Sequence, residues 1–321
     1  MELAELLPCG RYPAAPAALV KEWPADTLPG TIGSYVAAAI SDNTRRAYRG
    51  DLTDFLHWGG TIPCTPTVLA AYLVDRAPTL SPHTIARRLA GISRAHQSQG
   101  FADPARSDLV RTGLYGIRRQ HGGPQRQAAP LLTDELLTLL PVGADLKSQR
   151  DRALLLTGFA AALRRSELVA LDVRDLTFVA QGMVLTLRRS KTDQAGVGRK
   201  IGVPFGRPGA CPVTAAAKWI EHAHLHEGAV FRGIDKSGVL RGDRLTAQSV
   251  TLIVKARARA AGLDPSALSA HSLRAGLVTS AARAGIPSYK IQQQTGHRSL
   301  EMLARYIRDA SLFDQNAASV L

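Results

Sequence analysis

Residues 270–276 read Ala-His-Ser-Leu-Arg-Ala-Gly, and this stretch decides how the rest of the chain is interpreted. Its two basic side chains, His271 and Arg274, are three residues apart, so they share one face of a helix. Both belong to the first turn of the helix predicted here, where unpaired N–H groups attract anions. The stretch therefore predicts an anion site on a helical framework.

Further polar motifs flank this stretch in the sequence. Arg164 comes just before a short predicted helix and is followed three residues later by Glu167. Lys191 lies in the turn of a predicted hairpin, His297 follows a glycine, and Tyr306 comes nine residues after that histidine. Taken singly, each has an ordinary structural interpretation, such as a surface ion pair, a solvated turn lysine or a packed tyrosine.

Taken together, these residue types suit phosphoryl transfer. A tyrosine nucleophile conserves the free energy of a phosphodiester as a covalent ester. Fixed arginines stabilise the charge that develops on the non-bridging oxygens, because their planar forks bind two oxygens and stay protonated. A general acid must protonate the leaving oxygen, and a base must accept the proton of the tyrosine.

The ordered set resembles the tyrosine recombinase, or phage integrase, family, of the Cre-like or XerC/XerD-like kind. The resemblance implies a site-specific DNA recombinase that cleaves and rejoins strands through a 3′-phosphotyrosine intermediate. It implies that Arg164 and Arg274 clamp the scissile phosphate and that Tyr306 is the nucleophile. His271 would accept the proton of the tyrosine, and His297 would donate a hydrogen bond to the phosphate. Lys191 would be the general acid, with Lys200 as the competing lysine, and Glu167 would orient a catalytic cation. Two positions depart from the family pattern, since Ala162 stands where glycine is frequent and Ala275 where many members have a second histidine.

The fold is expected to be mainly α, with a helical core-binding domain followed by an α+β catalytic domain. We divide the chain into a mobile arm at 1–30, a DNA-binding domain at 31–118, a linker at 119–130 and a catalytic domain at 131–321. The Gly-, Pro- and Gln-rich composition of 119–130 is typical of a linker. Residues 182–205 alternate with a period of two and predict a β-hairpin.

Helix boundaries follow from capping residues and apolar periodicity. In the first domain we expect helices that begin at Asp42, near Pro66 and at Ser81, and a fourth over 104–117. In the second domain, a helix begins at Thr133, and Ser166 with Glu167 caps a short one that ends at Leu171. The remaining helices are predicted over 149–162, 213–226, 247–261, 272–284, 288–294 and 299–308.

The charge of the chain suits a polyanionic partner. The 321 residues include 40 Lys and Arg against 26 Asp and Glu, a formal net charge of +14. Such an excess favours nucleic acid, because each neutralised phosphate releases counterions, although a high arginine content alone would produce the same balance. The candidate DNA contacts lie on two helices of the first domain and are Arg45, Arg46, Arg49, His83, Thr84, Arg87, Arg88 and Arg94.

Partners and compartment are expectations too. The resemblance implies double-stranded DNA with inverted-repeat sites, a dimer on each site and a tetramer at synapsis, with the apolar residues of the C-terminal tail packing on a neighbouring subunit. No cofactor, no metal and no membrane is expected, and the sequence lacks an apolar span or signal peptide, which favours the cytoplasm and association with the nucleoid. Two alternatives stay open: a relaxing enzyme like a type IB topoisomerase, and a catalytically silent DNA-binding protein.

Overall fold

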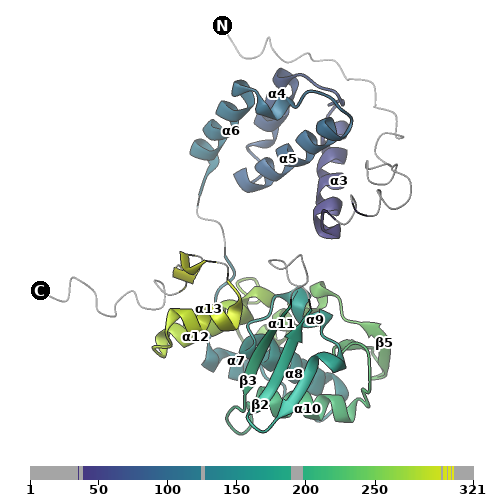
Figure 1. Cartoon of the computed structure of the whole chain (residues 1–321), viewed down its shortest axis with the longest axis vertical. Helices are drawn as coiled ribbons and strands as arrows, with labels where there is room; N and C mark the ends of the chain where they lie inside the picture. The colour runs from purple at the N-terminus through teal and green to yellow at the C-terminus, as the bar shows by residue number, and fades with distance from the viewer. Residues whose placement is uncertain are drawn as a thin grey trace, which may run out of the picture. The chain divides into compact units, whose positions relative to one another are not determined.

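The computed structural model describes residues 35, 39–123, 127–188, 198–297, 299–301, 303, 304 and 306 (Figure 1). The chain divides into two compact units, Met1–Gln125 (unit 1) and Arg126–Leu321 (unit 2). The division falls inside the stretch 119–130 that the sequence marks as a linker. The N-terminal arm predicted at 1–30 lies outside the described residues. Each unit is described by itself.

The described part of unit 1 consists of helices, and each of its four α-helices begins at a hydroxyl-bearing cap. Ser41, Thr65, Ser81 and Ser107 all accept a hydrogen bond from the backbone N–H three residues later, which satisfies one unpaired donor of the first turn. Ser41 corrects the predicted cap, because Asp42 is already the first helical residue. The elements are α3 (Asp42–His57), α4 (Pro66–Arg76), α5 (Pro82–Ser98), η3 (Pro104–Arg106) and α6 (Asp108–His121).

The fourth predicted helix of unit 1 is two elements rather than one. Asp103 caps the short η3 turn, and Ser107 then takes an extended conformation before α6 begins. Helix α6 runs to His121 and so extends into the predicted linker. The core of unit 1 includes Ile85 and Ile92 of α5, which are fully buried.

Unit 2 is mostly helical and carries two small antiparallel sheets. Its helices are α7 (Thr133–Leu139), α8 (Leu146–Ala160), α9 (Arg165–Ala170), η4 (Val173–Asp175), α10 (Pro212–His222), α11 (Ala247–Ala260), α12 (Ala270–Arg283) and α13 (Ser288–Thr295). The residues described at 300, 301, 303, 304 and 306 are helical as well. The mainly α fold with a small β component is confirmed.

The predicted hairpin exists and belongs to a three-stranded sheet. Strands β1 (Leu176–Val179), β2 (Gly182–Leu187) and β3 (Arg199–Pro204) lie side by side in that order, all antiparallel. The last pair of β2 and β3 joins Leu187 to Arg199. Strand β1 and the separate pair β4 (Arg232–Ile234) and β5 (Leu240–Arg244) are not predicted by the sequence pattern.

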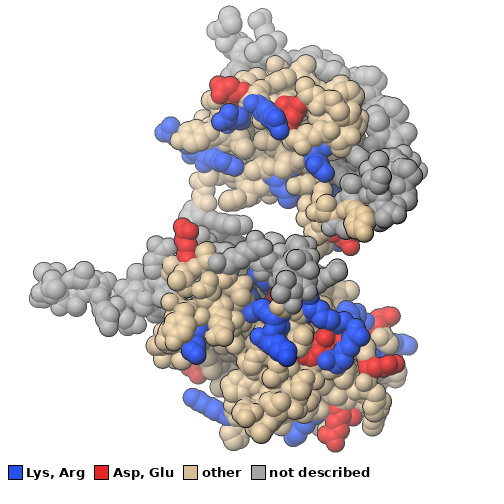
Figure 2. All heavy atoms as spheres, viewed as in Figure 1, with Lys and Arg blue, Asp and Glu red and all other residues tan. Residues whose placement is uncertain are grey.

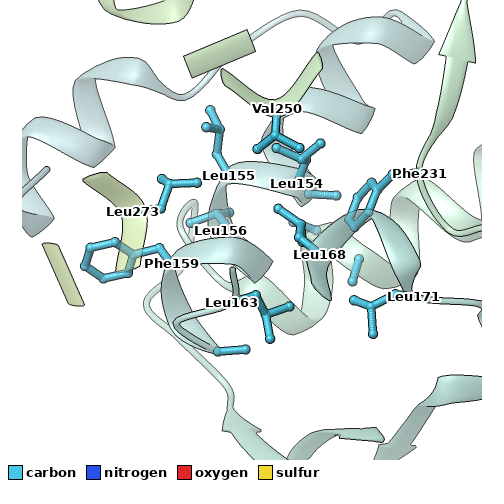
Figure 3. Close-up of a cluster of buried hydrophobic side chains, with 14 of the residues drawn as sticks. Leu154, Leu155, Leu156, Phe159, Leu163, Leu168, Leu171, Phe231, Val250 and Leu273 are labelled. Carbon is cyan, nitrogen blue, oxygen red and sulfur yellow. The ribbon is translucent and has the colours of Figure 1, made fainter. Parts of the chain in front are cut away.

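Helix α8 forms the centre of unit 2. Its residues Leu154, Leu155 and Leu156 point in three successive directions and are all buried, as expected for a helix covered on every side (Figure 3). Leu168 of α9 and Leu273 of α12 pack against it, and a side chain on Gly158 would meet both at 3.0 and 3.2 Å. The turn after α8, which carries Arg164, and the first turns of α12, which carry His271 and Arg274, are therefore fixed by the same core.

A second close approach fixes α12 itself. The N–H of Leu131 donates to the carbonyl of Ser272, and a Cβ on Gly276 would lie 1.8 Å from the carbonyl oxygen of Leu131. Only glycine permits this contact, because any side chain would overlap with backbone atoms. Gly276 thus sets the distance between α12 and the segment that leads into α7.

Candidate active site

Arg164 is held in place by Glu167 through two bonds. Helix α8 ends at Ala160, and Arg164 is the extended residue that precedes α9. The carboxylate of Glu167 accepts the backbone N–H of Arg164 at 2.9 Å and its Nη1 at 2.6 Å, and Glu167 is 4% exposed. Of the predicted capping pair, Glu167 does cap the helix and also orients the guanidinium, whereas Ser166 is already inside α9.

Arg274 is buried, at 2% exposure, and donates to two groups. Its Nη1 bonds the carbonyl of Ala162 at 2.6 Å, and its Nη2 lies 3.1 Å from Nε2 of His297. Ala162 has a φ of 49°, a left-handed conformation that is rare for a residue with a side chain. Burial, and then the charge of Arg164, lowers the pKa of Arg274 to about 10, so Arg274 stays positive at neutral pH.

The contacts of His297 identify its tautomer. Arg274 can only donate, so Nε2 of His297 is the acceptor of their bond. The proton is then on Nδ1, which lies 2.7 Å from Oγ1 of Thr295, and that hydroxyl donates in turn to the carbonyl of Ile291 at 2.8 Å. Burial, followed by the charges of Arg274 and Arg164, lowers the pKa of His297 to about 4. His297 is therefore neutral at physiological pH.

His271 and Tyr306 meet although they are far apart in the sequence. Nε2 of His271 lies 2.9 Å from the hydroxyl of Tyr306. Desolvation, and then the charges of Arg274 and Arg164, lowers the pKa of His271, which favours the neutral imidazole that can accept a proton. Tyr306 also packs on a small cluster that includes Leu303 and Ile291, so the packing interpretation and the chemical one hold together.

The structure adds one cation that sequence reasoning missed. Arg199, the first residue of β3, donates to the carbonyls of Gln294 and Thr295, both at 3.1 Å. It shares one strand face with the buried Ile201 and Val203, a period-two signal that the sequence contains. Lys200 is exposed on the opposite face of β3, and Lys191 lies outside the described residues.

Apart from Lys191, the predicted catalytic residues of unit 2 therefore form one group. Arg164, Glu167, Arg199 and Tyr306 all act electrostatically on Arg274. Lys and Arg side chains gather on the viewed face of unit 2, over the region of β2, β3 and β5 (Figure 2). Such a group can hold an oxyanion between guanidinium groups and deprotonate a phenol beside it.

The candidate DNA contacts of unit 1 differ in how far their side chains are exposed to solvent. Arg46, Arg49, His83, Arg87 and Arg94 are exposed, whereas Arg45, Thr84 and Arg88 are partly buried.

Arg88 corrects an expectation, because its side chain is turned into a polar network rather than toward solvent. Its side chain is 15% exposed and pairs with Asp54, and its Nη1 donates to the hydroxyl of Tyr72 at 2.8 Å. Arg87 pairs with the buried Asp51 at 2.5 Å. Both arginines thus help to hold α3, α4 and α5 together.

Metal-binding clusters and membrane-spanning helices are absent from the described part of the chain. Among the described residues, no group of three or more His, Cys, Asp or Glu side chains is placed to bind a metal ion. No helix within the described ranges is long and apolar enough to cross a membrane.

The comparisons with known proteins define the class. The model of the phage integrase family matches residues 131–312. The chain belongs to the phage integrase family, the tyrosine recombinases that cleave and rejoin DNA strands. It is 39% identical over 288 residues to an integrase/recombinase xerD homolog of Selenomonas ruminantium, which covers 86% of this chain and 84% of the relative. It is 28% identical to the tyrosine recombinase XerD of Pseudomonas putida, over 85% of this chain and 88% of that protein.

Solved structures agree in fold. A XerH site-specific recombinase bound to a palindromic difH substrate has a TM-score of 0.61 at 18% identity, covering 84% of this chain and 76% of that one. A lambda integrase dimer bound to a COC′ core site has a TM-score of 0.61 at 17% identity, covering 86% and 75%. At these identities the likeness shows the fold, and the roles of individual residues rest on the geometry above.

Proposed function

We propose that this enzyme recombines DNA by attack of Tyr306 on the scissile phosphate. The bond between Nε2 of His271 and the Tyr306 hydroxyl, 2.9 Å long, is the observation that carries the proposal. It places a neutral base on the nucleophile within the field of Arg164 and Arg274. A tyrosine that only packed in the core would not need a histidine bonded to its hydroxyl.

In the cleavage step, the Tyr306 oxygen forms a bond to phosphorus and the 5′ oxygen of the next nucleotide leaves. His271 accepts the phenol proton, and Lys191 supplies a proton to the leaving oxygen. The products are a 3′-phosphotyrosine and a free 5′-hydroxyl. Rejoining reverses these steps with the 5′-hydroxyl of another strand, so the covalent ester conserves the energy of the broken bond.

Arg164 and Arg274 neutralise the charge of the pentacoordinate transition state, and their fixed positions reduce the cost of reorganisation. His297 enters differently from the expectation. Its Nε2 accepts from Arg274 and carries no proton. A hydrogen bond from Nε2 to a phosphate oxygen therefore requires that Nε2 gains a proton, either by a change of tautomer or by protonation of the ring, and the negative charge of the phosphate favours the protonated ring.

The proposed partners are duplex DNA with inverted-repeat sites and further copies of this chain, a dimer on each site and a tetramer at synapsis. Two proteins of similar fold support this arrangement, since XerH is bound to a palindromic substrate and lambda integrase binds a core site as a dimer. The net charge of +14 supports a polyanionic partner. The proposed compartment is the cytoplasm, in contact with the nucleoid.

An apolar cavity of unit 2 supports the contact between copies. It has a volume of about 550 Å³ and is lined by Leu136, Leu137, Phe159, Leu277 and Ile286 among others. We assign it to the C-terminal tail of a neighbouring subunit, whose sequence includes Leu312 and Phe313. A chain truncated after residue 309 should then bind a single site but fail to form the synaptic tetramer, as measured by light scattering.

The test of the function uses binding sites selected from random DNA with the purified protein. A nicked duplex that carries the site should trap a covalent adduct with the wild-type protein and none with Tyr306→Phe. Absence of an adduct with the wild type, or its persistence in the variant, contradicts the mechanism and favours a silent DNA-binding protein. A plasmid with two sites should yield exchanged products, whereas a topoisomerase-like enzyme would only relax it.

A further inference from the structure

Arg199 occupies a junction between two parts of unit 2. It is the first residue of β3 and pairs with Leu187, the last residue of β2. The segment of sequence that contains Lys191 connects the two residues of this pair. The Arg199 side chain leaves the strand on its core-facing side, in phase with Ile201 and Val203. It therefore connects the base of the hairpin to the element packed on this face of the sheet.

The structure beneath Arg199 is the C-terminal end of α13. Nη1 donates to the carbonyls of Gln294 at 3.1 Å and Gln293 at 3.4 Å, and Nη2 donates to Thr295 at 3.1 Å. These carbonyls end a helix, so they lack partners within it and form the negative end of its dipole. A guanidinium group bonds them from two separate nitrogens in a fixed plane, a span that the single nitrogen of an ammonium group does not provide.

The next residue, Gly296, makes the contact tight. Gly296 has a φ of 66°, the left-handed conformation in which the chain leaves α13 toward His297. A Cβ on Gly296 would lie 2.7 Å from Cζ of Arg199. The guanidinium thus lies directly on the turn that orients the His297 imidazole.

The charge of Arg199 also belongs to the site. Arg199 lowers the pKa of Arg274 and of His297, so its field reaches both groups. Within the described parts of the chain, no carboxylate lies at ion-pair distance from Arg199. Its positive charge is offset only partly, by Glu167, which already pairs with Arg164.

We propose that Arg199 is a positioning residue for DNA cleavage, which holds the Gly296–His297 turn against the hairpin and so aligns His297 with Arg274. The proposal rests on the proposed function, since it concerns the same reaction. Arg199 acts through His297 rather than by touching the phosphate. Two consequences separate this role from general stabilisation of the fold. Replacing Arg199 should slow DNA cleavage by the folded protein, and the size of this effect should depend on His297.

The test measures single-turnover adduct formation on the nicked duplex at saturating DNA. Arg199→Met should slow cleavage about 10- to 100-fold, as expected when a reacting group is displaced by about 1 Å. DNA affinity should change less than about threefold, because Arg199 bonds carbonyls and releases no counterion. Arg199→Lys should recover only part of the rate.

Arg257 provides the matched control. It too is an arginine that donates to the end of a helix, at 2.8 Å to the carbonyl of Leu139 in α7. Arg257→Met should lower the melting temperature without slowing cleavage by the folded protein. Gly296→Ala is a second, independent variant, because its Cβ must displace the Arg199 guanidinium; it should reproduce the slow cleavage even if Arg199→Met does not fold.

A double-mutant cycle decides whether His297 mediates the effect. In a His297→Gln background, Arg199→Met should cost less than about threefold. Equal losses in both backgrounds, or wild-type cleavage by Arg199→Met, would overturn the proposal while leaving the wild-type adduct and the proposed function intact. Failure of the wild type to form any adduct would instead overturn the proposed function, and this proposal with it.

Discussion

Nε2 of His271 lies 2.9 Å from the hydroxyl of Tyr306, so the imidazole is already in place to receive the proton of the phenol. Because the pKa of His271 is lowered, the acceptor stays neutral below the ordinary histidine pKa of about 6.5. We expect the acid limb of single-turnover cleavage to lie below that pH. His271→Gln should reduce the rate about 100-fold or more and remove this limb. An unchanged pH profile in the variant would exclude His271 as the base.

His297 should make stability depend on pH. The pKa of His297 is about 4 in the folded chain and about 6.5 in the unfolded chain. Between these pH values, His297 therefore binds a proton only when the chain is unfolded. Stability is therefore complete above the unfolded pKa and is lost as the pH falls toward 4, by a contribution on the order of 3 kcal/mol. Urea unfolding across this range should show a shallower loss for His297→Gln, and no such change for the exposed His226→Gln.

Gly276→Ala should strongly destabilise unit 2. The added Cβ would lie 1.8 Å from the carbonyl oxygen of Leu131, and two backbone segments must separate to admit it. Overpacking of this kind costs about 3 kcal/mol or more. Gly202→Ala is the control in the same unit, because no atom lies within 4 Å of the position that its Cβ would take and its conformation suits alanine. Calorimetry that showed equal melting for both variants would contradict the close approach of α12 to Leu131.

The proton donor can be tested chemically. Lys191→Ala should slow cleavage of ordinary DNA about 100-fold or more, but not of DNA whose 5′ leaving atom is sulfur, since a thiolate leaves without protonation. Lys200→Ala should cleave both substrates normally, because Lys200 is exposed on the face of β3 opposite Arg199. If the sulfur substrate rescues Lys200→Ala instead, the assignment of the two lysines must be exchanged.

Two arginines of α5 should separate folding from DNA binding. Arg88→Ala removes the ion pair with Asp54 and the donor to the Tyr72 hydroxyl, while Arg76 still pairs with Asp54, and it should destabilise unit 1 by about 2 kcal/mol. Arg94→Ala should leave stability unchanged and reduce the salt dependence of DNA binding by about one counterion. Melting curves and binding measured at several salt concentrations distinguish these outcomes.

Sequence patterns predict most of the helical fold for identifiable reasons. Ser81 followed by Pro82 marks the start of α5 without ambiguity, and the alternation through β2 and β3 needs no tertiary information. Strand β1 escapes prediction because its four residues are mostly exposed and show no alternation. Strand β1 exists because it pairs with β2, and the residues of β1 alone carry no signal of that pairing.

The site is predictable in its residue types but not in its connections. The order of Arg164, His271, Arg274, His297 and Tyr306 indicates the chemistry, and the structure brings them together. Arg199 escapes prediction because its partners are the carbonyls of a helix more than ninety residues away in the sequence. The placement of Arg88 is also hidden, because helical periodicity identifies the apolar stripe but not the acidic side chains that a neighbouring helix presents.

Arg164, Arg199 and Arg274 share one carboxylate, Glu167, among the described residues that act on them. Three like charges are thus held close together by the rest of unit 2, and their mutual repulsion opposes folding. In the proposed reaction, the scissile phosphate supplies counter-charge to Arg164 and Arg274, while Arg199 stays bonded to the carbonyls at the end of α13. We therefore expect the bound site to raise the melting temperature of the enzyme, so that the substrate acts as a structural ligand as well as a reactant.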